Sequence, residues 1–156
     1  MKLKDLTAEL DRIFEIDLAL PGDATGLQTG RADSDIKTIL ITLDITEPVV
    51  DEAISLKADL VISHHPLIFD PITKITGDSM QSLKIIKLVE NRIAAYTAHT
   101  NFDSATGGLN DHIAGRIGLK NIKIMEKSLQ QWYKFTIFVP VEAESEIRDA
   151  ICRSGG

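Results

Sequence analysis

The chain has 156 residues, of which 44% are hydrophobic and 26% charged, and its formal net charge is -6. This composition is typical of a soluble globular protein, and an acidic chain without a basic run argues against binding to nucleic acids or anionic membranes. The N-terminus lacks the apolar core of a signal peptide, no apolar stretch could span a bilayer, and the single cysteine, Cys152, has no partner for an internal disulfide, so we expect a cytoplasmic protein.

The first part of the chain predicts a helix, a loop and a strand–helix–strand unit. Apolar residues recur at helical spacing from residue 3 to 15, and turn-forming residues crowd 21–30, which predicts a loop. Residues 38–43 are apolar and β-branched and predict a strand buried on both faces. Thr46 can cap the helix that follows, and residues 59–63 predict the second strand. Strands joined in this way run parallel.

The strand–helix pattern continues beyond this unit. Residues 67–77 show no clear period and predict a long loop, and Asp78 with Gln81 resembles a capping box at the start of a second helix. Residues 93–98 predict the third strand. A later helix is expected to end at Gly118.

The pattern changes near the end of the chain. Residues 133–139 alternate and predict a strand, and residues 142–153 predict a helix. We therefore expect an α/β domain over 1–130, with a mainly parallel sheet flanked by helices, and the start of a second, α+β domain over 131–156.

Polar residues follow each of the three predicted parallel strands. Pro66 keeps the histidine pair before it out of helical backbone. Because the carboxyl ends of parallel strands meet at one edge of a sheet, these side chains are expected to lie together. The residues are Asp44 after the first strand, His64 and His65 after the second, and His99 and Asp103 after the third.

Histidine and carboxylate side chains together suit zinc, manganese, iron, cobalt or nickel. Neighbouring histidines on a regular strand point to opposite faces, but on a loop they can serve two ions a few ångströms apart, with Asp103 shared between them. A single histidine at a strand end is more often structural, whereas the pair followed by His-x-x-x-Asp favours metal. His112 receives no role, and Asp44 can equally be a turn residue.

One rival family can be tested on the sequence. The DHH phosphoesterases also place two histidines at a strand end, with an aspartate directly before them. Here that position holds Ser63, which argues against them.

Several motifs together resemble the NGG1-interacting-factor-3-like family, also labelled type-2 GTP cyclohydrolase I homologue. They are Leu43-Asp44-Ile45-Thr46, Asp59-Leu60-Val61-Ile62-Ser63-His64-His65-Pro66-Leu67-Ile68-Phe69, Ala98-His99-Thr100-Asn101-Phe102-Asp103 and Gly107-Gly108-Leu109-Asn110-Asp111. The resemblance implies an α/β fold, a dinuclear metal site and ring-shaped homohexamers. It makes His64, His65 and Asp103 metal ligands and His99 a residue close to the metals.

The chain departs from the family pattern in two places. The family loop Trp-Asp-Asn-x-Gly-Leu reads Gly22-Asp23-Ala24-Thr25-Gly26-Leu27 here, so that Asp23 matches and the tryptophan and asparagine do not. The C-terminal His-x-x-x-Glu motif, which supplies two further ligands in the family, has no counterpart. We therefore expect an N-terminal fragment of a longer protein, with weak metal binding because its ligand set is incomplete.

The resemblance implies a metal-dependent hydrolase that acts on a nucleotide-like small molecule, with two divalent transition-metal ions per full-length subunit. The alternative is a non-catalytic metal-binding oligomer with a regulatory or partner-binding role. A scaffold with a vestigial site is the third interpretation.

Overall fold

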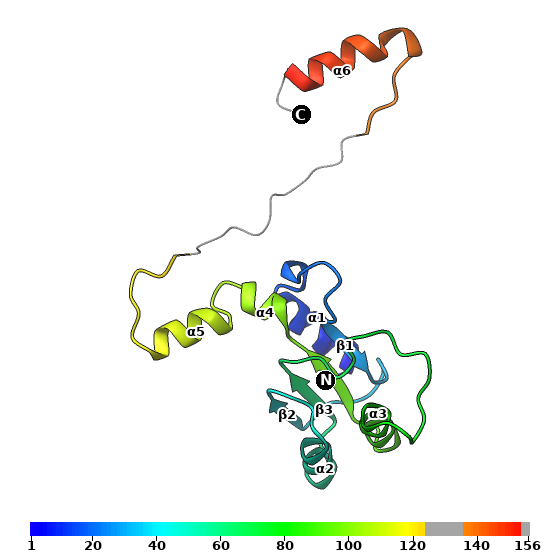
Figure 1. Ribbon diagram of the computed structural model, residues 1–156, viewed down its shortest axis with the longest axis vertical. Coiled ribbons are helices and arrows are strands. Elements are labelled where there is room, and N and C mark those ends of the chain that lie inside the picture. The colour runs from blue at the N-terminus through cyan, green and yellow to red at the C-terminus, as the bar shows by residue number, and fades with distance from the viewer. Residues whose placement is uncertain (124–135, 154–156) are drawn as a thin grey trace. The chain divides into compact units, whose positions relative to one another are not determined.

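The computed structural model describes residues 1–123 and 136–153. The chain divides into two compact units, Met1–Ile122 and Lys123–Gly156, which are considered separately (Figure 1). The predicted domain boundary at residue 130 lies outside the described residues and stays a prediction.

A four-stranded mixed sheet forms the centre of the first unit. The strands are β1 (Gly26–Thr29), β2 (Ile39–Thr42), β3 (Leu60–Ser63) and β4 (Ala94–Thr97), in the order β1-β4-β3-β2. Strands β2, β3 and β4 run parallel, and β1 pairs antiparallel with β4. This confirms the predicted α/β fold with a mainly parallel sheet.

The unit's α-helices are α1 (Leu3–Ile13), α2 (Glu47–Ser55), α3 (Met80–Glu90), α4 (Thr100–Ser104) and α5 (Leu109–Arg116), and a 3-10 turn, η1 (Ile16–Leu18), follows α1.

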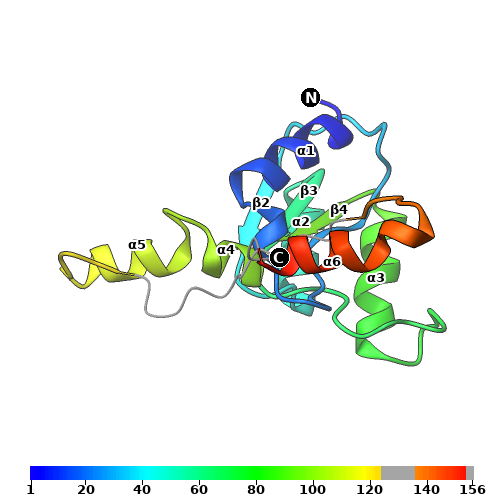
Figure 2. The same ribbon diagram turned by 90° about the horizontal axis from the view of Figure 1, so that it is seen from above.

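Helices cover both faces of the sheet, so the central strands are buried on each side. On one face α2 and α3 pack against β3 and β4, and on the other α1 packs against the same two strands. Figure 2 shows α1 and α3 on opposite sides of the sheet. As predicted, the Thr46 side chain caps α2, where its hydroxyl accepts a hydrogen bond from the Val49 amide at 3.4 Å.

Strand β2 corrects one prediction, because it lies at an edge of the sheet and is not buried on both faces. Ile39, Ile41 and Leu43 are 42%, 77% and 57% exposed. An apolar run shows that a strand can be buried, but its neighbours in the sheet decide whether it is. Among the described residues, no helix covers this side of β2.

Strand β1 corrects a second prediction, since residues 26–29 were expected to be loop. Its four residues carry no alternating apolar pattern, and pairing with β4 alone makes them a strand. Gly30 follows with φ +137°, and a Cβ at this position would lie 2.7 Å from the Ala94 Cβ atom. The backbone therefore approaches β4 more closely than any other residue type allows.

Two smaller differences from the predictions concern a short helix and the start of another. Residues 100–104 form the short helix α4, which is too short to leave a periodic signal in the sequence. The N-cap of α3 is Ser79, whose hydroxyl accepts from the Ser82 amide at 3.1 Å, and not Asp78 as the capping-box prediction had it. Gly118, with φ +82°, follows the end of α5 as predicted.

The second unit contains the 3-10 turn η2 (Val141–Ala143) and the helix α6 (Glu144–Arg153), in agreement with the predicted helix over 142–153. The strand expected over 133–139 is absent from 136–139, while 133–135 lie outside the described residues. A strand needs a partner for its backbone groups, and none pairs with these residues within the described part. Among the described helices, none is both long and apolar enough to cross a bilayer.

Candidate functional site

The polar residues predicted at the strand ends meet at the carboxyl edge of the parallel strands. Asp44 follows β2, the histidine pair follows β3, and His99 follows β4 directly before α4. Asp103 lies on α4. Parallel topology alone predicted this grouping, and the contacts below confirm it.

The backbone of the histidine pair is fixed by the neighbouring chain. The His64 and His65 amides donate to the carbonyls of Thr42 and Leu43 at 3.3 and 2.9 Å, so backbone hydrogen bonds toward the β2 segment continue for two residues past β3. The buried Ser63 hydroxyl donates to the His65 carbonyl at 2.8 Å. The pair is thus held in a bend of non-helical backbone, as Pro66 indicated.

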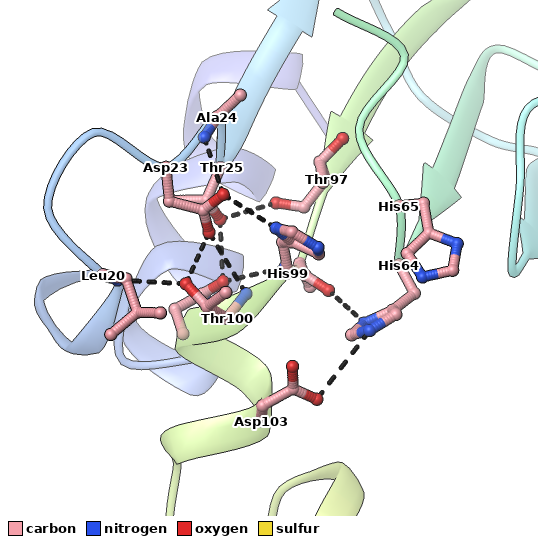
Figure 3. A network of polar contacts seen from close by, with 12 residues as sticks. Leu20, Asp23, Ala24, Thr25, His64, His65, Thr97, His99, Thr100 and Asp103 are labelled. Carbon is pink, nitrogen blue, oxygen red and sulfur yellow. Dashed lines mark hydrogen bonds and ion pairs between the residues drawn. The ribbon is translucent and has the colours of Figure 1, made fainter. Parts of the chain in front are cut away.

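Each of the three histidines has its Nδ1 atom bound to an oxygen acceptor, and Figure 3 shows these contacts for His64 and His99. His64 Nδ1 lies 2.9 Å from the Ala98 carbonyl, and His99 Nδ1 lies 2.7 Å from Asp23 Oδ1. His65 Nδ1 lies 2.7 Å from Asp44 Oδ1. Because each oxygen partner accepts, Nδ1 is the donor in these contacts, and the neutral form of each ring presents the lone pair of Nε2.

The three rings are close enough to share one centre. Ring nitrogens of His64, His65 and His99 lie within 4.8 Å of one another, and the ring centroids are 4.9 to 5.9 Å apart. Asp103 reaches this group through His64, with 3.8 Å between its Oδ1 atom and His64 Nε2. The side chains of His64 and His99 are only 16% and 19% exposed, whereas that of His65 is 48% exposed.

Asp23 is the most buried charged group of the site, with a side chain 4% exposed. Its carboxylate accepts from His99, from the Ala24 amide and from both the amide and the hydroxyl of Thr100. Burial raises the pKa of Asp23, but the hydrogen bonds from Thr100 and His99 together outweigh it and leave the pKa below its usual value. Asp23 is therefore ionised beside His99 at neutral pH.

Sequence reasoning missed two residues, Asn101 and Thr25, that support the backbone around His99. Asn101 is fully buried, and its side chain accepts from the His99 amide at 2.9 Å and donates to the Phe14 carbonyl at 2.9 Å. The Thr25 hydroxyl lies 2.7 Å from the same Asn101 oxygen. Asn101 stands inside a motif quoted for the family resemblance, the one signal that could have marked it, whereas Thr25 occupies the variable position of the family loop.

An apolar hollow of about 400 Å³ opens beside His64 and is lined by β2, β3, α4 and α5 residues that include Ile62, Phe102 and Leu109. A larger hollow of about 490 Å³, between Thr29–Ser34 and Val89–Ile93, lies at the opposite end of β4 and away from the histidines. We assign the chemistry to the histidine end because the titratable groups converge there. His112 is exposed on α5, outside the cluster.

Comparison with known proteins places these residues in a family context. The family model described as Duf34/NIF3 (NGG1p interacting factor 3) matches residues 1–153. The chain is 39% identical over 139 residues to a protein of Halalkalibacterium halodurans and 37% identical over 152 residues to one of Listeria monocytogenes, both named GTP cyclohydrolase 1 type 2 homolog. These alignments cover 88% and 97% of this chain but 37% and 41% of the relatives, so the chain spans less than half their length.

The fold of the first unit also recurs in solved structures. A Bacillus cereus protein related to NIF3 superposes with a TM-score of 0.78 at 40% sequence identity, over 83% of this chain and 35% of that one. The family model spans the strand ends that carry the histidines, and the structural match extends over 83% of the chain. The chain therefore belongs to the Duf34/NIF3 family.

Proposed function

We propose that this chain carries a divalent transition-metal centre of a metal-dependent hydrolase that acts on a nucleotide-like small molecule. One observation supports the proposal above all others: three clustered histidines each have Nδ1 engaged and Nε2 available. Metal-binding histidines almost always donate their second ring N–H to a carboxylate or carbonyl, which fixes the tautomer and the ring orientation.

The donor set fits such ions chemically. Imidazole nitrogens with a carboxylate oxygen suit zinc, iron, manganese, cobalt or nickel. His64, His65 and Asp103 would hold two ions, and the carboxylate-bound His99 lies close enough to reach the same centre. Low exposure of His64 and His99 limits competition from bulk water.

The chain's own residues would have two roles, to orient the histidines and to make room for a substrate. Asp23 and Asp44 orient His99 and His65 through their Nδ1 atoms. The apolar hollow beside His64 offers room for a substrate next to the histidines. When bound, divalent ions supply the Lewis acidity that activates water for attack and stabilises developing negative charge. The nucleotide-like substrate is inferred only from the names of the relatives.

Metal binding and hydrolysis measured together test the proposal. Because the incomplete ligand set predicts weak binding, Zn²⁺ or Mn²⁺ is titrated into the chain at equilibrium, and the chain is assayed in excess metal against a nucleotide panel that includes GTP. We expect saturable metal binding and chelator-sensitive turnover in the wild type, and the loss of both in His65→Ala. The control is His112→Ala, which removes an exposed histidine outside the cluster. Turnover that survives in His65→Ala would refute the metal mechanism.

A further inference from the structure

Phe69 is a large aromatic residue that the fold leaves exposed next to the histidines. It is 60% exposed and belongs to neither hydrophobic core cluster of the first unit. Its ring centroid lies 6.3 Å from that of His99, with an angle of 85° between the rings. Single exposed apolar residues are common on protein surfaces, so exposure alone means little. What distinguishes Phe69 is its position at the edge of the histidine cluster.

The backbone on the N-terminal side of Phe69 is firmly held, although its side chain is not buried. The Gln28 side chain accepts from the Ile68 amide at 2.8 Å and donates to the Ile68 carbonyl at 2.9 Å. The Gln81 side chain donates to the Leu67 carbonyl, and the Leu67 side chain is buried. On the C-terminal side, Ile72 packs against the core.

This arrangement fixes the backbone that carries the aromatic ring before any ligand arrives. A ring on an anchored backbone loses little conformational freedom when another ring binds to it, which favours affinity. A phenyl group has no donor or acceptor, so it cannot bind a metal or a phosphate. Its chemical use is to stack against, or meet edge-on, another planar ring.

We infer that Phe69 is a stacking platform that selects ligands with a planar aromatic or heteroaromatic ring beside the group held at the histidines. The inference rests on the proposed function for the location of that group and goes beyond it by assigning ring recognition to one residue. Phe69 is thus a specificity-determining residue, whereas the histidines and Asp103 hold the reacting end.

Two probes that differ only in the ring test this assignment. Adenosine 5′-monophosphate and ribose 5-phosphate share the sugar phosphate, and their affinities for the chain are measured by NMR titration in zinc-loaded and chelator-treated protein. Stacking of a base on an aromatic side chain is worth a factor of about 5 to 150 in affinity. We expect the wild type to prefer the adenosine probe by a factor in this range.

Variants then isolate the ring. Phe69→Leu keeps an apolar side chain and should lose most of the preference without weakening ribose 5-phosphate, and Phe69→Trp should retain the preference. Ile75→Ala is the control, because Ile75 is an exposed apolar residue of the same loop. An unchanged preference in Phe69→Leu, or no preference in the wild type, would overturn the inference.

Two further outcomes separate this inference from the proposed function. A base preference that depends on Phe69 but is the same with and without zinc supports the platform and contradicts the metal proposal. Zinc binding without a base preference supports the metal proposal and contradicts the assignment of Phe69 as a stacking platform. If Phe69→Leu changes only the oligomeric state in size-exclusion chromatography, Phe69 is a contact between copies and the inference is wrong.

Discussion

The central strands β3 and β4 and the edge strand β2 all come from largely apolar segments, but they contribute differently to the molecule. Every residue of β4 and three of the four in β3 are buried, whereas β2 has exposed and half-buried residues in alternation. The central strands carry all three clustered histidines at their ends, and β2 contributes Asp44, which orients one of them. The comparison teaches that burial of the central strands sets the positions of the histidines, while the edge strand β2 contributes only Asp44, which orients the His65 ring.

The largest expected effect tests burial directly. Leu60 in β3 is fully buried, and Leu60→Ala should lower the free energy of unfolding by about 2–5 kcal/mol through lost transfer energy and the cavity left behind. Ile41 in β2 is 77% exposed, and Ile41→Ala should change the free energy of unfolding by no more than about 0.5 kcal/mol. Urea unfolding of both variants measures the difference. A comparable loss in Ile41→Ala would mean that this side of β2 is covered in solution.

The second prediction compares the two carboxylates that orient histidines. Asp23→Asn should weaken metal binding by about 10–100-fold, a typical cost for the loss of such an orienting group. Asp44→Asn should weaken it less, because Asp44 is 52% exposed and water can replace its hydrogen bond to His65. Competition with a chromophoric chelator gives both affinities, and thermal unfolding without metal checks that each variant folds. A larger effect at Asp44 would reverse the ranking of the buried and the exposed carboxylate.

The smallest effect concerns Tyr96 of β4, whose buried hydroxyl donates to Asp11 Oδ1 at 2.8 Å and ties the strand to α1. Burial and the Asp11 carboxylate raise the pKa of Tyr96 far above its usual value. Tyr96→Phe should cost about 1 kcal/mol at neutral pH through the lost hydrogen bond.

The same residue predicts a pH dependence. Because the folded-state pKa is raised, the stabilisation from neutral Tyr96 is complete below about pH 10, the unfolded value, and falls as the pH rises above it. Unfolding curves from pH 8 to 11.5 should therefore show a steeper alkaline loss in the wild type than in Tyr96→Phe. Parallel losses would show that Tyr96 ionises freely in the folded protein.

Several elements could be predicted from the sequence because local chemistry determines them. Thr46 caps α2 through its own hydroxyl, and the apolar runs that became β3 and β4 are buried as expected. The histidine pair could be located because an apolar run ends there and Pro66 excludes a helix. The roles of His64, His65 and Asp103 as ligands remain predictions.

Other features depend on pairing and packing, which leave no local pattern. Gly26–Thr29 is a strand only because β4 offers a partner, and the exposed side of β2 follows from its place at the edge. Gln28 and Asn101 act on chain segments 40 and 87 residues away, at Ile68 and Phe14. Contacts of such separation carry no signal in a single sequence.

The sequence by itself determined which chemical groups are present, that residues 38–43, 59–63 and 93–98 give three parallel strands, and that their ends would bring Asp44, the histidines and Asp103 to one edge. Only the tertiary structure decided which ring nitrogen each histidine presents, since that depends on acceptors from Ala98, Asp23 and Asp44. It also decided that Phe69 stays exposed beside His99. The physical reason is that composition and periodicity are local, whereas hydrogen-bond partners and burial are set by neighbours distant in the chain.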